Sequence, residues 1–294
     1  MNNKNLTGHL TALLTIIIWG TTFISTKILL GAFSPVEILF IRFVLGYLAL
    51  LIIAPRRLRT SSPKEELTLA AAGLCGICLY YLLENIALTY TLASNVGVMV
   101  SVAPFFTAIL TQLFLRGEER LRSIFFIGFL ISIVGIVLIS FNGSRLELNP
   151  LGDLLAIAAA LMWGFYSILT KKIGGYGYSL ILTTRRTFFY GILFMLPALF
   201  LLDFKPEALL CFVKPPYLYH FLFLGLGACA LCFVTWNYAV KILGALKTSV
   251  YIYLVPVITI TASVLFLHER VTLLSVLGTV LILLGLFLSE KNGH

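Results

Sequence analysis

The stretch LTGHLTALLTIIIWGTTFISTKILL at residues 6–30 is apolar over most of its length, and it has a counterpart, PLGDLLAIAAALMWGFYSILTKKIG, at residues 150–174. The Trp-Gly pair and the following Lys align at an offset of 144 residues (163 minus 19), which matches Trp19, Gly20 and Lys27 with Trp163, Gly164 and Lys171. As a helix, about 20 apolar residues cross a hydrocarbon core about 30 Å thick. The two stretches therefore predict membrane-spanning helices in two related halves of the chain.

The composition extends this interpretation to the whole chain. Of its 294 residues, 60% are apolar and only 11% are charged, with a mean hydropathy of +1.03, whereas soluble domains carry roughly 25% charged residues. Long apolar runs with little β alternation satisfy their backbone polar groups in a bilayer as helices. We predict an all-α integral membrane protein whose ten transmembrane helices lie near residues 9–29, 35–54, 67–89, 95–115, 122–141, 151–171, 179–201, 217–240, 247–267 and 272–289.

Three further sequence matches extend the repeat. Arg42 returns as Arg186 at the offset of 144. At an offset of 152 (237 minus 85), four residues return: Asn85, Ala87, Ala93 and Pro104 match Asn237, Ala239, Ala245 and Pro256. At an offset of 150 (278 minus 128), Glu119, Arg120, Gly128 and Gly135 match Glu269, Arg270, Gly278 and Gly285. Each half, 1–144 and 145–294, has an odd number of predicted helices, so the halves have inverted orientations, an architecture typical of transporters.

The basic residues predict the orientation of the chain. The net charge of +9 is spread over short loops between apolar runs, which indicates membrane orientation rather than a nucleic-acid surface. A cytoplasmic N-terminus puts most loop cations, such as Arg56, Arg57 and Arg59, in the cytoplasm. The opposite side then holds only Arg145, Lys205, Lys214 and Arg270. The positive-inside rule therefore predicts that both termini are cytoplasmic.

The repeated blocks resemble the EamA-type family of the drug/metabolite transporter superfamily. The resemblance rests on the Trp-Gly pair with Lys seven residues later, on the Ala-Leu-x-Tyr-Thr-x-Ala-Ser run at residues 87–94, on the Pro-containing helix after it, and on Leu-x-Glu before the last helix of each half. It covers nearly the whole chain. It implies a five-plus-five inverted fold in the bacterial inner membrane, and export of amino acids, metabolites or toxic compounds by alternating access. The chain departs from the pattern in a longer loop at residues 116–119, and in Glu84, which stands where the second half has Trp236.

Glu84 is the sharpest candidate for function. An ionisable group inside an apolar helix costs at least about 2.5 kcal/mol on insertion scales and usually faces a cavity or a partner. One interpretation is a carboxylate that takes up a proton and couples it to substrate movement. Another is an ion pair with Arg42, since both residues lie roughly 10 Å deep at 1.5 Å per residue. The third is a position at the lipid edge, with the carboxylate directed to the interface.

The other intramembrane polar groups also allow two interpretations each. Arg186 lacks an acid at the place that Glu84 has in the first half, so it is predicted either to contact a substrate anion or to reach cytoplasmic headgroups. Asn85 and Asn237 are predicted to bond a substrate or to join helices. Pro104 and Pro256 each remove a backbone donor in mid-helix, which predicts either a gating hinge or a static kink.

Aromatic residues predict where the cavity lies. Trp19 and Trp163 are each followed by Gly, which pairs a flat ring with a gap in the helix surface, and such a ring either stacks on a substrate or packs between helices. Residues three or four positions further on share that helix face. The predicted cavity residues are Trp19, Thr22, Phe23, Asn85, Trp163, Tyr166, Ser167, Arg186, Trp236 and Asn237.

Taken together, the sequence predicts a secondary transporter for which a monomer is sufficient. The predicted partners are a small-molecule substrate and the lipid bilayer, with no nucleic acid and no cofactor. An uncoupled facilitator or a channel is the alternative. A membrane enzyme is disfavoured, because the four histidines are scattered and no H-E-x-x-H, G-x-S-x-G or phosphate-cradling loop occurs.

Overall fold

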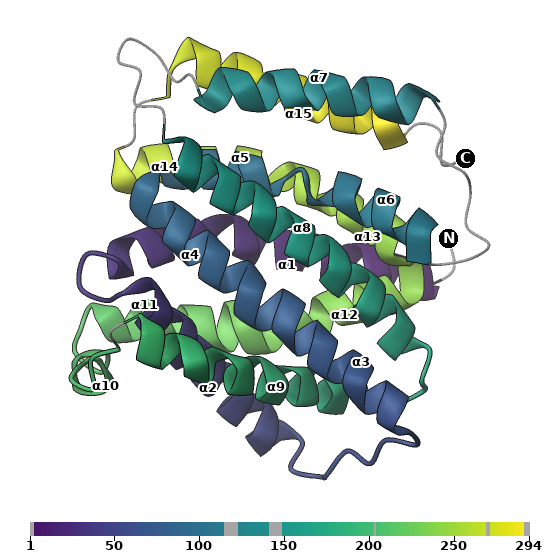
Figure 1. Cartoon of the computed structure of the whole chain (residues 1–294), viewed down its shortest axis with the longest axis vertical. Coiled ribbons are helices and arrows are strands. Elements are labelled where there is room, and N and C mark those ends of the chain that lie inside the picture. Colours follow the sequence, from purple (N-terminus) through teal and green to yellow (C-terminus); the bar gives the residue numbers. More distant parts are fainter. Residues whose placement is uncertain (1–2, 115–122, 141–148, 203, 269–270, 291–294) are drawn as a thin grey trace.

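The computed structural model describes residues 3–114, 123–140, 149–202, 204–268 and 271–290, so the predicted loop residues 116–119 and the Glu119-Arg120 and Glu269-Arg270 matches lie outside it. Within the described ranges the chain is helical and contains no strand (Figure 1). The first half contains α1 (Asn3–Leu29), α2 (Pro35–Ile53), α3 (Pro63–Gly73), η1 (Leu74–Leu79), α4 (Tyr80–Tyr90), α5 (Ala93–Val100), α6 (Ala103–Phe114) and α7 (Ser123–Ser140). The second contains α8 (Pro150–Gly174), α9 (Leu180–Leu201), α10 (Ala208–Cys211), α11 (Tyr217–Leu222), η2 (Phe223–Leu231), α12 (Cys232–Leu243), α13 (Ala245–Ser249), η3 (Val250–Leu254), α14 (Val255–Leu267) and α15 (Leu273–Glu290).

Among the residues that the structure describes, seven helical spans are long and apolar enough to cross a membrane. They are Asn5–Leu29, Pro35–Ile53, Pro63–Tyr90, Ala93–Phe114, Pro150–Gly174, Tyr217–Leu243 and Lys247–Leu267. Shorter apolar segments, Phe126–Gly135 and Leu273–Gly285, lie within α7 and α15. The helical, membrane-spanning character predicted from the apolar runs is therefore confirmed.

Local sequence signals explain where two of these spans begin. Ser34 caps α2 in a reciprocal capping box: its backbone N–H donates to Glu37 Oε2 at 2.8 Å, and its side chain accepts from the Glu37 N–H. Ser62 caps α3 through one bond, its side chain accepting from the Glu65 N–H, and Pro63 follows at the first helical position. Helix α3 therefore begins at Pro63, four residues before the start predicted at residue 67. The Ser62 cap and Pro63 favour helix here although the first turn is polar.

The long helices are interrupted in ways that apolar periodicity does not reveal. Two of the spans contain wide π-helical segments, η1 in Pro63–Tyr90 and η2 in Tyr217–Leu243. The helix predicted at 95–115 is divided into α5 and α6, and the helix predicted at 247–267 is divided into α13, η3 and α14. Pro104 and Pro256 are the second residues of α6 and α14, so each proline marks the start of a new helix. A proline is tolerated there because the first helical N–H groups have no intrahelical acceptor.

The pair α7 and α15 forms a separate layer at one edge of the molecule (Figure 1). Glycines bring their backbones together: a Cβ added to Gly285 would lie 2.3 Å from the Gly128 carbonyl oxygen, and one added to Gly135 would lie 2.5 Å from that of Gly278. Ser132 Oγ also donates to the Ile282 carbonyl at 3.2 Å. Small residues that allow close backbone approach are the usual basis of helix association in lipid.

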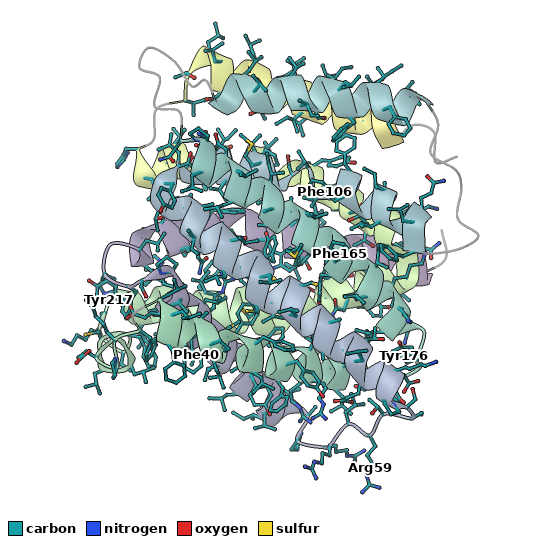
Figure 2. All side chains as sticks on the ribbon, in the orientation of Figure 1. Phe40, Arg59, Phe106, Phe165, Tyr176 and Tyr217 are labelled. Carbon is teal, nitrogen blue, oxygen red and sulfur yellow. The ribbon has the colours of Figure 1, made fainter. Side chains whose placement is uncertain are left out.

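The two ends of the helical bundle are distinct. In Figure 1, α1 begins and α15 ends on the same side of the bundle. Figure 2 shows Arg59 and Tyr176 on that side, and Tyr217 on the opposite side. Many apolar side chains point outward, as expected when lipid covers the outer surface, and Phe200, Ile52 and Leu273 are each more than 70% exposed, at 86%, 81% and 74%.

We expect Gly135→Ala to weaken the α7–α15 contact by about 1–3 kcal/mol, because the new methyl group must displace the backbone near Gly278. Thermal unfolding of the purified protein in detergent measures the loss. Gly174→Ala is the matched control, since its added Cβ would meet only the Lys241 side chain at 3.8 Å. Equal melting temperatures for the two variants would contradict the proposed close contact.

Candidate functional site

A small cavity lies among α1, α4, α5, α8 and the η3–α14 segment. Both halves of the chain contribute to it. The lining residues are Ile16, Trp19, Thr22, Phe23, Tyr80, Tyr81, Glu84, Val100, Trp163, Ile252 and Val255. Of the predicted cavity residues, Trp19, Thr22, Phe23 and Trp163 are therefore on its wall, together with Glu84.

The two repeated tryptophans meet at this cavity. The ring centroids of Trp19 and Trp163 are 5.1 Å apart and nearly perpendicular, at 88°. Tyr80 lies 5.0 Å from Trp163 and 4.7 Å from Tyr81, also by centroids. Trp236 packs behind this group, 5.1 Å from Trp19, and is not on the cavity wall. Edge-to-face contacts of this kind hold aromatic rings in fixed orientations.

Phe233 is the centre of the packing behind the cavity. Its ring contacts those of six other aromatic residues, at centroid distances from 5.1 to 6.1 Å: Trp19, Phe43, Tyr81, Trp163, Tyr166 and Phe188. The Trp19 Nε1–H also donates to the Ala228 carbonyl at 3.0 Å, within η2. Wide π-helical turns occur frequently at functional sites. Here η2 fixes the tryptophan and η1 immediately precedes Tyr80 and Tyr81.

Glu84 presents an ionisable group to the cavity. Its side chain is only 1% exposed, and Tyr80 and Tyr81 lie one helical turn earlier on the same helix. In the described part of the chain, its Oε1 atom has no hydrogen-bond partner. A buried carboxylate with an open acceptor carries a large desolvation cost unless a proton or a cation reaches it.

The predicted direct ion pair between Arg42 and Glu84 is not formed. The Arg42 guanidinium stacks on Tyr81, with Cζ 4.4 Å from the ring centroid, and its Nε donates to Cys229 Sγ at 3.3 Å. Among the described residues, its Nη1 and Nη2 atoms have no hydrogen-bond partner. The physical reason is that α2 packs against η2, which directs the guanidinium towards Cys229. Matched depth did not guarantee that the two side chains would meet.

The two asparagines and their neighbours lie outside the cavity wall. Asn85 Nδ2 donates to the Pro35 carbonyl at 3.0 Å, which joins α4 to the start of α2. Asn237 accepts from the Tyr166 hydroxyl and donates to Thr184 Oγ1, both at 3.0 Å. Ser167 Oγ donates to the Trp163 carbonyl at 2.9 Å. The hydrogen bonds of both asparagines join helices, whereas that of Ser167 closes on its own helix. Both amides therefore make contacts of the helix-joining kind.

Arg186 has a protein partner that its position in the repeat did not reveal. Its Nε donates to Glu66 Oε1 at 2.6 Å, and the same oxygen accepts from the Tyr190 hydroxyl. Arg186 is not on the cavity wall, so the predicted substrate contact is not supported there. The expectation of an unpaired charge was wrong because it rested on the second half alone, which has no acid at the position that matches Glu84. The acid comes instead from α3 of the first half, which packs against α9.

Three residues of the cavity wall, Tyr80, Tyr81 and Val255, were missed from the sequence. Val100 and Ile252 complete the wall, and each lies four residues before a proline, where the sequence predicts a freed backbone carbonyl. Helical spacing gives a usable signal for the two tyrosines, because Tyr80 and Tyr81 lie one turn before Glu84 on the same helix. The described residues contain no group of three His, Cys, Asp or Glu side chains that could hold a metal ion.

Comparison with known proteins decides the family. The model of the EamA-like transporter family matches residues 6–141 and again residues 150–290. The chain belongs to the EamA-like transporter family. A protein of Archaeoglobus fulgidus that is named an uncharacterized transporter is 28% identical to this EamA-family chain over 300 residues. The alignment covers the full length of both proteins. The family resemblance seen in the sequence is thereby confirmed.

Two other comparisons bear on fold and function. A probable terminal-alkyne amino-acid exporter of Streptantibioticus cattleyicolor is 25% identical over 282 residues, which cover 95% of this chain and 92% of that protein. A solved crystal structure matches with a TM-score of 0.69 over 97% of each chain at 20% identity, and so shares the fold. The EamA-family chain is therefore a multi-pass membrane transporter protein, and its family points away from enzymes.

We expect a double-mutant cycle on Arg186→Gln and Glu66→Gln to give a coupling energy of about 0.2–1 kcal/mol, because the pair is partly exposed. Unfolding of the purified protein in a denaturing detergent measures it. Arg57→Gln, at an exposed loop position, combined with Glu66→Gln is the control and should give no coupling. A zero value for the first cycle would mean that this ion pair does not stabilise the α3–α9 contact.

Proposed function

We propose that this chain is a secondary transporter that moves small organic molecules by alternating access through the cavity at Trp19, Trp163 and Glu84. The observation that carries the proposal is that the cavity wall comes from both halves of the chain, with α1, α4 and α5 on one side and α8, η3 and α14 on the other. A site at the meeting of two halves can be exposed to either face of the membrane by a rocking motion of one half against the other.

The proposed architecture has ten spans in two inverted halves, 1–144 and 145–294. Three helices add to the seven long apolar spans: α7, α9 and α15. Corresponding features support the repeat, since η1 and η2 precede α4 and α12, and Pro104 and Pro256 begin α6 and α14. The helix breaks before these prolines are the proposed hinges, between α5 and α6 and between η3 and α14. Val100, the last residue of α5, and Val255, the first residue of α14, lie on the cavity wall.

Export of amino acids or other small organic metabolites or drugs is the proposed direction and cargo. The support is the named relative from Streptantibioticus cattleyicolor, a probable amino-acid exporter. The proposed location is the inner membrane, with both termini cytoplasmic, because the cation-rich α2–α3 connection at Arg56, Arg57 and Arg59 lies on the side where α1 begins.

Glu84 is the proposed site of proton coupling. Its carboxylate faces the cavity and its Oε1 lacks a partner among the described residues, so a proton taken up there would change the charge that a substrate meets. A facilitator without coupling would carry the same substrate down its gradient only. The response of transport to an imposed pH gradient distinguishes the two.

We expect Val100→Phe to reduce saturable transport at least about tenfold, because the added ring occupies the space that a substrate needs on the cavity wall. Uptake of a labelled panel of amino acids, nucleobases and organic cations into proteoliposomes measures it, with and without a pH gradient. Val137→Phe, at a side chain on α7 that is 44% exposed, is the matched control and should transport normally. Transport that is unchanged in Val100→Phe would exclude this cavity as the pathway.

We expect a green fluorescent protein fused after the last residue to fluoresce, and alkaline phosphatase fused at the same place to be inactive, because the first folds in the cytoplasm and the second requires an oxidising compartment. The same pair of reporters fused after Tyr90 should give the reverse pattern. Active phosphatase at the C-terminus would contradict the proposed orientation.

A further inference from the structure

The polar character of the cavity is strongly one-sided. Glu84 is the ionisable acid on its wall, and no Lys, Arg or His is among the described lining residues. Thr22 Oγ donates to the Trp19 carbonyl at 2.7 Å, so its proton is already used. Two buried polar atoms at the wall lack partners in the described chain, Glu84 Oε1 and the Trp163 Nε1–H. The wall also carries the Tyr80 and Tyr81 hydroxyls.

The rest of the wall offers aromatic surfaces next to this carboxylate. Trp19, Trp163, Tyr80 and Tyr81 line the cavity, with neighbouring rings 4.7–5.1 Å apart. Their mutual edge-to-face or tilted contacts turn the rings in different directions around one space, rather than stacking them in parallel. Aromatic faces attract cations, and groups of them recognise ammonium ligands.

Arg42 does not supply an opposite pole to the cavity. It is fully buried and absent from the wall, and its guanidinium stacks on Tyr81 and bonds to Cys229. A substrate carboxylate in the cavity would therefore meet Glu84 and the aromatic faces, with no cation on the wall to bind it directly, because the guanidinium lies behind the Tyr81 ring. This arrangement disfavours an anionic or zwitterionic ligand, since a buried charge without a partner is costly.

We propose that Glu84 and the aromatic cage of Trp19, Trp163, Tyr80 and Tyr81 bind the ammonium group of a small organic cation that lacks a carboxylate. The ammonium contacts Glu84 Oε1, and the apolar body of the ligand lies against the tryptophans. This proposal rests on the proposed transport function and narrows the proposed cargo to organic amines without a carboxylate, which excludes the amino acids named there. An inorganic cation fits less well, because such ions need several oxygen ligands, and the wall offers one carboxylate and hydroxyl groups.

The size of the cavity limits the ligand. The free volume enclosed by its wall is only about 30 Å³, so a ligand larger than a few water molecules enters only when the two halves move apart, as alternating access requires. A small probe, a single ring with a short amine chain, keeps the required movement small. Three probes of nearly equal shape separate the charge classes: 2-phenylethylamine is a cation, 2-phenylethanol is neutral, and phenylalanine is a zwitterion.

Binding is measurable without labels because the three tryptophans of the chain, Trp19, Trp163 and Trp236, all belong to this aromatic group. We expect 2-phenylethylamine to change the tryptophan fluorescence of the purified protein with an affinity at least about tenfold higher than either other probe, equivalent to about 1.4 kcal/mol. The charge-removing variant Glu84→Gln should lose this preference. Glu207→Gln, at an exposed position outside the cavity, is the matched control and should keep it.

Transport of the same three labelled probes into proteoliposomes completes the test. Preferred binding and uptake of the amine, both lost in Glu84→Gln and kept in Glu207→Gln, would support the proposal. Equal or stronger binding and uptake of phenylalanine or the alcohol would overturn the substrate class and leave the transporter in place. Uptake of another member of the wider panel, with no binding of the amine, would also overturn the substrate class and keep the transporter function. If no compound showed saturable uptake, the proposed function would be overturned too.

Discussion

The burial of two opposite charges in an apolar helical bundle is the constraint on which the centre of this protein depends. Arg42 and Glu84 are 0% and 1% exposed, and neither charge contacts the other directly. The guanidinium is instead stabilised by the Tyr81 face and the Cys229 sulfur, while the carboxylate retains an open acceptor at a cavity. Separating the charges in this way leaves one of them accessible to a ligand, because an ion pair would have used both.

A repeated scaffold carries an unrepeated site. Trp19 and Trp163 correspond in the sequence and meet face to edge, which places residues from both halves on one cavity. Glu84, in contrast, corresponds to Trp236, which packs behind Trp19. The matching asparagines also differ, since Asn85 bonds to a backbone carbonyl and Asn237 bonds to two side chains. Similar helices therefore provide the frame, and a few unequal side chains provide its chemistry.

Four of the ten predicted cavity residues, Trp19, Thr22, Phe23 and Trp163, lie on the cavity wall, and the other six lie off it. The signals that the sequence offers, apolar context and helical spacing, are local properties, whereas polar partners come from distant segments. Arg186 was misjudged because its partner, Glu66, is 120 positions away (186 minus 66), and only the packing of α3 on α9 brings them together. The π-helical segments η1 and η2 were missed because they contain only apolar and glycine residues, so the rotation of the helix face by an inserted residue leaves no mark in the sequence pattern.

The sequence by itself determined the helical membrane-spanning character and the family resemblance, because these follow from apolar run length and from local motifs. Only the tertiary structure decided which polar atoms are open. The Tyr166 hydroxyl and the Asn237 amide satisfy one another, whereas Glu84 Oε1 and Trp163 Nε1 have no partner in the described chain. Whether a buried polar group has a partner depends on side chains from distant helices, and these distances are set by packing rather than by local sequence.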